Sequence, residues 1–268
     1  MTPNVLTIAG TDPSGGAGIQ ADLKAFSALG AYGMSVITAV VAQNTQGVVD
    51  IHPIPPAFVA AQIDSVFTDV RVDAVKIGML GSAEVVRCVA AALRRHIPRY
   101  VVLDPVMVAK SGDRLLEADA VAALRAELLP LVDLITPNLA EAADLLGDAQ
   151  AATEQQMRDQ LDRLGRLGAA VLLKGGHLDG PDSVDLLWVD QHFTRLSAPR
   201  VHTRNTHGTG CTLSAAITAL RPQRPDWASS VADAKQYLTR ALQASDQLDV
   251  GRGHGPQHHF HAWWPPAG

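Results

Sequence analysis

Residues 205–212 read Asn-Thr-His-Gly-Thr-Gly-Cys-Thr and lead directly into an apolar, helix-forming segment, residues 213–220. Two glycines and small hydroxyl residues at the start of a helix leave backbone N–H groups pointing at one spot, and the helix dipole adds roughly half a positive charge there. Such a turn is typical of a phosphate site. Cys211 falls at the helix start, where a thiol pKa is usually depressed, so it is a candidate proton acceptor. The plain alternative is a tight loop with a buried cysteine.

The composition restricts the classes of protein to which the chain can belong. Of its 268 residues 47% are hydrophobic, and 22 basic side chains stand against 27 acidic ones, for a net charge of −5. The sequence contains no stripe of basic residues, which argues against nucleic acid as the main partner. No apolar run reaches the ~18 residues that span a membrane. Two cysteines without metal-ligand spacing, and an N-terminus without a signal peptide, indicate a cytoplasmic protein.

Short apolar segments alternate with helical patterns along the chain. The strands that we expect are residues 5–9, 34–42, 74–77, 100–103, 131–136 and 170–173, then an antiparallel hairpin, 184–189 with 192–198. Helix starts are marked by an N-cap at Ser82 and by a capping box, Thr153 with Gln156. This alternation predicts one domain over residues 1–268, with a tail at 251–268. We expect a three-layer α/β fold whose mainly parallel sheet carries helices on both faces.

Polar residues follow several of these strands at the point where each strand ends. Asp104 follows residues 101–103, Asn138 and Glu141 follow the next strand, and Lys174 follows residues 170–173. Ligands of parallel sheets bind beyond the carboxyl ends of the strands, so these side chains should converge. A lysine, acidic and amide groups and an anion turn together match phosphoryl transfer assisted by Mg²⁺.

Each of these residues also has an ordinary structural explanation. Asn138 and Glu141 fit the N-cap and N3 positions of a capping box, Asp104 could cap a turn, and Lys174 could be a solvated loop lysine. The site is not of the Walker type, because no Gly-x-x-x-x-Gly-Lys-Ser/Thr occurs, and residues 10–18 lack the Rossmann fingerprint. It is the joint occurrence of the set that favours phosphoryl transfer.

The motifs resemble those of the ribokinase-like superfamily and, within it, the hydroxymethylpyrimidine/phosphomethylpyrimidine kinases of thiamine biosynthesis. The superfamily turn usually carries a catalytic aspartate where this chain has Cys211, and a cysteine at this position matches the subgroup. The matching segments are residues 6–22, 41–45, 76–80, 103–107, 135–142 and the His/Trp-rich tail at 258–264.

The resemblance implies an ATP- and Mg²⁺-dependent kinase that phosphorylates 4-amino-5-hydroxymethyl-2-methylpyrimidine and then its monophosphate, and it suggests a homodimer. The implied substrate residues are Gln43, Gly10, Asp22, Met79 and Val106. The implied ATP residues are Lys174, Asn138, Glu141 and Thr206, and the implied metal residues are Asp104 and Glu141. Gly208, Thr209 and Gly210 would form the anion hole, and Cys211 would take the hydroxymethyl proton.

Two other functions fit part of this pattern. A pyridoxal kinase is the first, because related members with the cysteine also accept pyridoxal-type rings. A non-catalytic pyrimidine-binding regulator on a kinase fold is the second, although the complete polar set argues against it. We further expect residues 109–113 to form a mobile flap, because this polar segment contains a glycine and follows Asp104.

Overall fold

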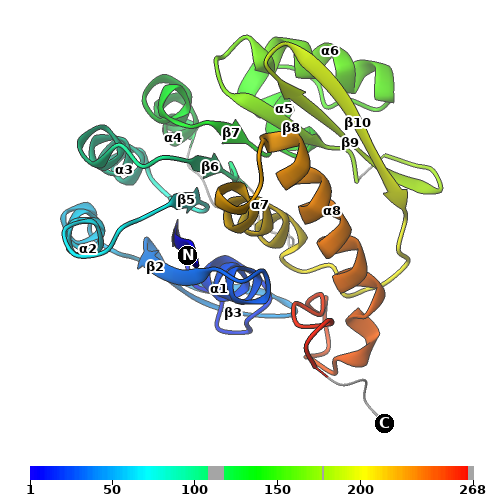
Figure 1. Cartoon of the computed structure of the whole chain (residues 1–268), viewed down its shortest axis with the longest axis horizontal. Helices are drawn as coiled ribbons and strands as arrows, with labels where there is room; N and C mark the ends of the chain where they lie inside the picture. Colours follow the sequence, from blue (N-terminus) through cyan, green and yellow to red (C-terminus); the bar gives the residue numbers. More distant parts are fainter. Residues whose placement is uncertain (108–117, 177, 265–268) are drawn as a thin grey trace.

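A central eight-stranded sheet organises the protein, as seen in a computed structural model that describes residues 1–107, 118–176 and 178–264 (Figure 1). The strand order is β10-β9-β8-β7-β6-β5-β1-β2. The parallel strands are β1 (Asn4–Ala9), β2 (Tyr32–Ile37), β5 (Ala74–Ile77), β6 (Val101–Leu103), β7 (Leu134–Ile135) and β8 (Ala170–Lys174). β9 (Asp182–Val189) and β10 (His192–Pro199) complete one edge as an antiparallel hairpin. The predicted α/β class is therefore confirmed.

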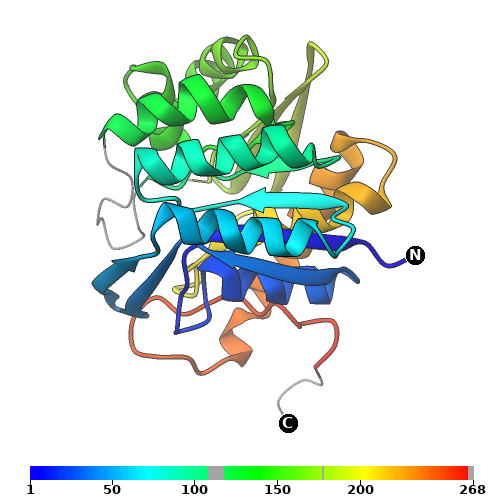
Figure 2. The same ribbon diagram turned by 90° about the vertical axis from the view of Figure 1, so that its left-hand side faces the viewer.

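Helices cover both faces of the sheet, and each face has its own core (Figures 1 and 2). The helices of one face are α2 (Pro56–Phe67), α3 (Ala83–His96), α5 (Leu139–Leu146) and α6 (Glu154–Gly165). Those of the other are α1 (Gly18–Ala28), α7 (Thr209–Leu220) and α8 (Trp227–Gln243). Because side chains alternate along a strand, Leu6 and Ile8 of β1 enter the first core and Val5 enters the second.

The expected strand at residues 34–42 is wrong in extent, because the chain changes sheets within it. β2 ends at Ile37, opposite Ala9, the last residue of β1. Beyond this point β1 offers no partner, and the chain continues as β3 (Ala39–Asn44), which pairs with β4 (Gly47–Pro53) in a separate two-stranded sheet. Thr38 fixes the change of direction, since its hydroxyl donates to the carbonyl oxygen of Met79 at 2.7 Å.

A helical stretch that the sequence analysis did not identify covers residues 118–131. It comprises α4 (Ala118–Ala123), a π turn (Leu124–Leu128) and a 3₁₀ turn (Leu129–Leu131). The change to a tighter turn coincides with Pro130, which has no N–H to continue an α-helix. Buried residues at helical spacing, Ala120, Ala123, Leu124 and Leu128, are the signal that could have revealed it.

Three helices begin with side-chain caps at the predicted residues. The Ser82 hydroxyl accepts from the Val85 N–H at 3.4 Å, and the Thr153 hydroxyl accepts from the Gln156 N–H at 3.2 Å. The Gln156 side chain, however, reaches the N–H of Ala152 instead of closing the box on Thr153. A complete capping box forms at α5, the third start.

Two expectations from the sequence concern a flap and membrane segments. The expected flap at residues 109–113 lies outside the described residues. Among the helices that the structure describes, none combines the length and the apolar character that crossing a membrane requires.

Candidate active site

The carboxyl ends of β6 and β8 bring Asp104 and Lys174 into a direct ion pair. The Lys174 ammonium donates to Asp104 Oδ1 at 2.9 Å, and the hydroxyls of Thr136 and Ser214 donate to the same carboxylate at 3.1 and 3.3 Å. Burial would raise the pKa of Asp104, but Lys174 and Lys76 more than offset it, so this pKa is lowered and the group is ionised at neutral pH. Lys174 is thus a paired, mostly buried lysine and not a solvated loop lysine.

Asn138 and Glu141 form the capping box of α5, and Glu141 also faces the lysine. The Asn138 N–H donates to Glu141 Oε2 at 2.7 Å, and the Glu141 N–H donates to Asn138 Oδ1 at 2.9 Å. Glu141 Oε2 lies 3.9 Å from the Lys174 ammonium. The structural explanation and the functional one therefore coexist, because the cap holds a carboxylate beside Lys174 and Asp104.

The turn at residues 205–212 reaches the same ion pair. Gly208 has a left-handed φ of +76°, and a Cβ there would lie 1.8 Å from the carbonyl oxygen of Gly16, so only glycine fits. A Cβ on Gly210 would lie 3.2 Å from Lys174 Nζ and 3.6 Å from Asp104 Oδ2. In the described part of the chain, the N–H groups of Gly210 and Cys211 have no hydrogen-bond acceptor. Two amide donors at a helix start thus lie beside the lysine, an arrangement suited to a phosphate.

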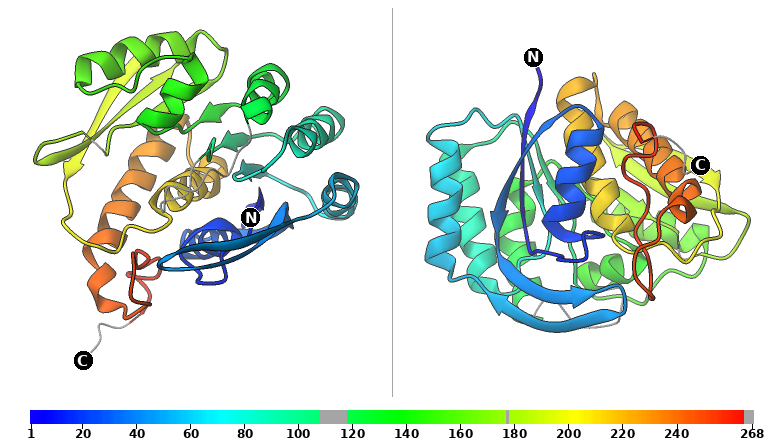
Figure 3. Two further views of the ribbon diagram at one scale, coloured as in Figure 1. Left: turned by 180° about the vertical axis from the view of Figure 1, so that it is seen from behind. Right: turned by 90° about the horizontal axis from the view of Figure 1, so that it is seen from below.

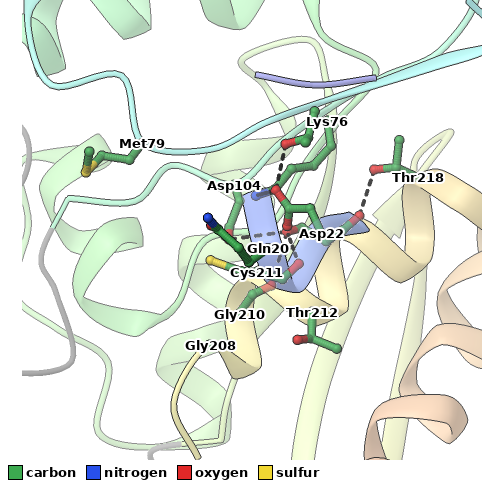
Figure 4. A network of polar contacts seen from close by, with 12 residues as sticks. Gln20, Asp22, Lys76, Met79, Asp104, Gly208, Gly210, Cys211, Thr212 and Thr218 are labelled. Atoms are coloured by element: carbon green, nitrogen blue, oxygen red, sulfur yellow. Dashed lines mark hydrogen bonds and ion pairs between the residues drawn. The ribbon is translucent and has the colours of Figure 1, made fainter. Parts of the chain in front are cut away.

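Cys211 follows this turn, but its titration differs from the expectation for a helix start. Burial raises the pKa of the Cys211 thiol to about 11, although the Lys76 ammonium and the Gly18 N–H act in the opposite direction. The predicted depression of this pKa is wrong, because desolvation outweighs the groups that favour the thiolate. Figure 4 shows the Cys211 side chain beside Asp104 and the Asp22–Lys76 pair.

Asp22 is buried in an ion pair with Lys76. Its carboxylate accepts from the Lys76 ammonium at 2.9 Å and from the Thr7 hydroxyl at 2.6 Å, and both partners of the ion pair have 0% exposure (Figure 4). Its role toward a substrate stays a prediction. The pair sets the charge environment of Cys211, since Lys76 lowers and Asp22 raises the thiol pKa.

Of the other predicted substrate residues, Gly10, Met79 and Val106 follow the carboxyl ends of β1, β5 and β6. A Cβ on Gly10 would lie 2.5 Å from Met79 Cε, so these two residues are in contact. Gln43 projects from β3, where a bulge shifts the register between Ala42 and Gln43. Val106 follows β6, two residues after Asp104, and is partly exposed. Their roles toward a substrate remain predictions, as does the role of Thr206 toward ATP.

Comparison with known proteins connects this geometry to a family. The family described as phosphomethylpyrimidine kinase matches residues 12–258. The chain belongs to the phosphomethylpyrimidine kinase family. A hydroxymethylpyrimidine/phosphomethylpyrimidine kinase from Escherichia coli (strain K12) is 62% identical over 262 residues, which cover 97% of this chain and 98% of the relative. The predicted phosphotransferase class is therefore confirmed.

The solved structures similar to this family member include pyridoxal kinases with bound nucleotides. An ADP complex of Bacillus subtilis pyridoxal kinase matches with a TM-score of 0.90 and 35% identity, covering 98% of this chain and 99% of that one. A Staphylococcus aureus pyridoxal kinase in complex with AMP-PCP and pyridoxal matches with a TM-score of 0.89 and 32% identity, covering 98% and 95%. These likenesses agree with the ribokinase-like architecture expected from the sequence.

Two buried polar pairs of the kinase escaped the sequence analysis. One is Lys76 with Asp22, and its signal was a lysine inside the otherwise apolar strand 74–77. The other is His207 Nε2 with Asp12 Oδ2 at 2.8 Å, which joins the anion turn to the first glycine-rich turn. Hydrogen bonds from His207, Ser14 and Gln43 outweigh burial and hold the pKa of Asp12 far below its usual range. Asp12 is therefore an anion that links these elements.

Glu141→Gln should raise the melting temperature of the ligand-free kinase at pH 8 by a few degrees. Burial raises the pKa of Glu141 from 4.5 to about 7, so the folded state binds its proton more tightly than the unfolded chain. The resulting cost to stability grows from about pH 4.5 to 7 and persists above it. Glutamine keeps an acceptor for the Asn138 N–H without the charge.

Circular dichroism melts at pH 4 and pH 8 would check this sign, since the gain should vanish at pH 4. The matched control is Glu154→Gln at the exposed start of α6, where Arg195 and Arg158 lower the carboxyl pKa. This control should slightly lower the melting temperature at pH 8. A lower melting temperature for Glu141→Gln at pH 8 would mean that the attraction of Lys174 outweighs the cost of burial.

Proposed function

We propose that the chain transfers phosphoryl groups from ATP to 4-amino-5-hydroxymethyl-2-methylpyrimidine, first to the alcohol and then to the resulting monophosphate, for thiamine biosynthesis. The observation that carries this proposal is the position of Gly210, whose Cβ would lie 3.2 Å from Lys174 Nζ. The anion turn and the lysine can therefore bind one phosphate from two sides. The named activity of the 62% identical relative supports the choice of substrate.

The proposed roles follow from the geometry. Lys174 holds the ATP phosphates, with Asn138 and Thr206 beside them, and the N–H groups of residues 208–211 stabilise charge on the group in transfer. Cys211, in its thiolate form, accepts the proton of the hydroxymethyl group. Gly10, Met79, Val106 and the Gln43 amide enclose the pyrimidine, and the amide can donate and accept at a ring nitrogen beside an exocyclic amine.

Mg²⁺ is part of the proposal, and the donor set fits it. Asp104 and Glu141 supply carboxylate oxygens, the ligands that Mg²⁺ prefers, and Mg²⁺ in kinases takes one or two carboxylates plus substrate phosphates. The residues that the structure describes contain no group of three or more His, Cys, Asp or Glu side chains suited to hold a metal alone. The bound ion would neutralise charge on the phosphates, and Glu141 would reach it through water.

A cytoplasmic homodimer completes the proposal. Both thiols, Cys88 and Cys211, are free, as in a reducing compartment. The resemblance to the pyrimidine kinases supports the dimer. Light scattering on the purified protein tests it: a mass near twice 28.3 kDa is expected, and a mass of one chain would contradict it.

Pyridoxal kinase activity is the second candidate, because the similar solved structures from Bacillus subtilis and Staphylococcus aureus are pyridoxal kinases. Identity favours the pyrimidine, at 62% to the pyrimidine kinase against 35% and 32% to those structures. Steady-state rates with the two rings under identical conditions decide: the pyrimidine should give the higher kcat/KM. A non-catalytic regulator is contradicted if ATP consumption rises when the pyrimidine is added.

Gln43→Ala should weaken pyrimidine binding and leave ATP affinity nearly intact. Losing one paired amide contact costs roughly 1–3 kcal/mol, about 5- to 150-fold in Kd. Isothermal titration with each ligand measures the split, and Val49→Ala on β4 of the same hairpin, a residue 77% exposed, is the control. Equal losses for ATP and pyrimidine would remove Gln43 from the pyrimidine pocket.

A further inference from the structure

The segment Gly251–His259, here termed the strap, lies across the active-site edge although none of the roles above uses it. It follows α8 and passes between the β3–β4 hairpin and the start of α7 (Figures 1 and 3). Gln257, His258 and His259 have exposures of only 0%, 3% and 4%. Hydrogen bonds hold the Gln257 and His259 side chains, and the His258 ring packs against that of Trp264, so this segment has specific contacts.

One end of the strap is fixed to the hairpin that carries Gln43. The Thr45 hydroxyl accepts from the Gly253 N–H at 3.1 Å, and the Thr45 carbonyl oxygen accepts from the His254 N–H at 2.9 Å. A Cβ on Gly253 would lie 2.0 Å from that carbonyl oxygen, so the close approach requires glycine. These two hydrogen bonds thus fix the strap to the turn between β3 and β4.

The other end of the strap is fixed to the anion turn. The His207 N–H donates to the Gly255 carbonyl oxygen at 3.0 Å, and Gln257 Nε2 donates to the Gly208 carbonyl oxygen at 3.2 Å. Gln257 Nε2 also donates to the Thr212 hydroxyl, which contacts His259 Nε2 at 2.9 Å. One glutamine side chain therefore spans the first turn of α7, from its N-cap to its fourth residue.

These contacts decide where the amide donors of the turn point. The Gly208 carbonyl oxygen accepts from the Thr212 N–H at 2.9 Å as well as from Gln257, so the strap fixes both ends of the helical turn on which the free N–H groups of Gly210 and Cys211 lie. Burial lowers the pKa of His259 to about 3, so this histidine is neutral and adds hydrogen bonding but no charge. The strap consequently affects the geometry of the anion turn and leaves its electrostatics unchanged.

We propose that Gln257 is a positioning residue for both phosphoryl transfers, acting through Gly208 and Thr212 to hold the amide donors of the anion turn in place. The inference rests on the proposed function. Misplacement of a catalytic group by about 1 Å can cost 10²-fold in rate, so loss of this brace should lower kcat roughly 10- to 100-fold. KM for ATP and pyrimidine should stay within about twofold, because the brace acts on the transition state.

The test compares Gln257→Met, which keeps the volume but loses the hydrogen bonds, with Arg252→Ala, an exposed substitution in the same strap. Pre-steady-state rates are measured for the alcohol and the monophosphate on protein whose folded fraction is known from thermal unfolding. Gln257→Met should lower kcat equally in both steps, and Arg252→Ala should match the wild type. An unchanged kcat, or a loss explained by the unfolded fraction, would overturn the inference.

A second pair of variants keeps the inference testable if Gln257→Met does not fold. Thr212→Val removes the hydroxyl that Gln257 and His259 share, whereas Thr212→Ser retains it. Thr212→Val should reproduce the fall in kcat and Thr212→Ser should restore most of it. Equal rates in the two variants would contradict the brace. If the wild-type protein is inactive, the proposed function is overturned as well. If the wild type is active and the variants have the same rates, only this inference is overturned.

Discussion

Cys211→Ala is expected to slow phosphorylation of the pyrimidine alcohol by 10²–10⁴-fold, the usual size of general-base assistance, and to leave phosphorylation of the monophosphate nearly unchanged. The alcohol must lose a proton as it attacks, and Cys211 is the candidate acceptor beside the anion turn. The monophosphate is already an anion and needs no base. The anion hole consists of backbone N–H groups, so it should survive the substitution.

The thiol pKa adds a pH dependence to this prediction. Because burial raises the pKa of Cys211 to about 11, the neutral thiol predominates at pH 7 and the thiolate fraction rises about tenfold per pH unit. The rate of the first step should therefore increase from pH 6 to 9 in the wild type, and this increase should be absent in Cys211→Ala. Cys211→Ser should not restore the rate, since a hydroxyl is a poorer proton acceptor than a thiolate.

Single-turnover rates with the alcohol and with its monophosphate separate the two steps. Cys88→Ala is the matched control, because Cys88 is a half-buried thiol of α3 that donates to the Pro56 carbonyl oxygen, on the opposite face of the sheet from α7. It should change neither rate. Equal losses in both steps for Cys211→Ala would show that Cys211 supports the anion hole and is not the base.

Gly208→Ala should lower both phosphorylation rates by roughly 10²–10³-fold, the cost of losing a preorganised donor. The new Cβ would lie 1.8 Å from the Gly16 carbonyl oxygen, and the φ of +76° disfavours any residue with a Cβ. The turn must move away from the first glycine-rich loop, and its N–H groups then no longer converge. Both steps should suffer alike because both transfer a phosphoryl group through this turn.

Gly147→Ala separates backbone strain from the loss of the anion hole. Gly147 ends α5 with a φ of +64°, yet a Cβ there meets no atom within 4 Å. This control should lower stability and keep both rates per folded molecule. Rates in Gly208→Ala that match this control would mean that the turn does not stabilise the transferring group.

Local patterns predicted the sheet and the meeting of Asp104 with Lys174. Apolar strands ending in Asp104, Asn138 and Lys174 required convergence at one edge, and the structure brings Asp104 into contact with Lys174. The same reasoning treated residues 34–42 as one strand, because apolar character alone does not show where a neighbouring strand ends. Which strands pair depends on residues that are far apart in the sequence. In the structure Gln43 therefore lies in the β3–β4 hairpin and not in the main sheet.

The remaining differences arise from burial, which no short motif reports. The helix-start rule favoured a low pKa for Cys211, but desolvation in the folded protein reverses it. The sequence does not show that Asp22 is fully buried, and the folded chain pairs it there with Lys76. In the sequence the strap was visible only as the beginning of a tail at 251–268, because its contacts with Thr45 and Gly208 join residues far apart in sequence.

Product analysis by mass spectrometry tests the central claim most directly. The protein is incubated with 4-amino-5-hydroxymethyl-2-methylpyrimidine and Mg-ATP, and the products are followed over time, with pyridoxal in a parallel reaction. The pyrimidine monophosphate is expected to accumulate first and then to decline as the diphosphate forms. A reaction that leaves the pyrimidine unphosphorylated while pyridoxal is converted to its phosphate would contradict it.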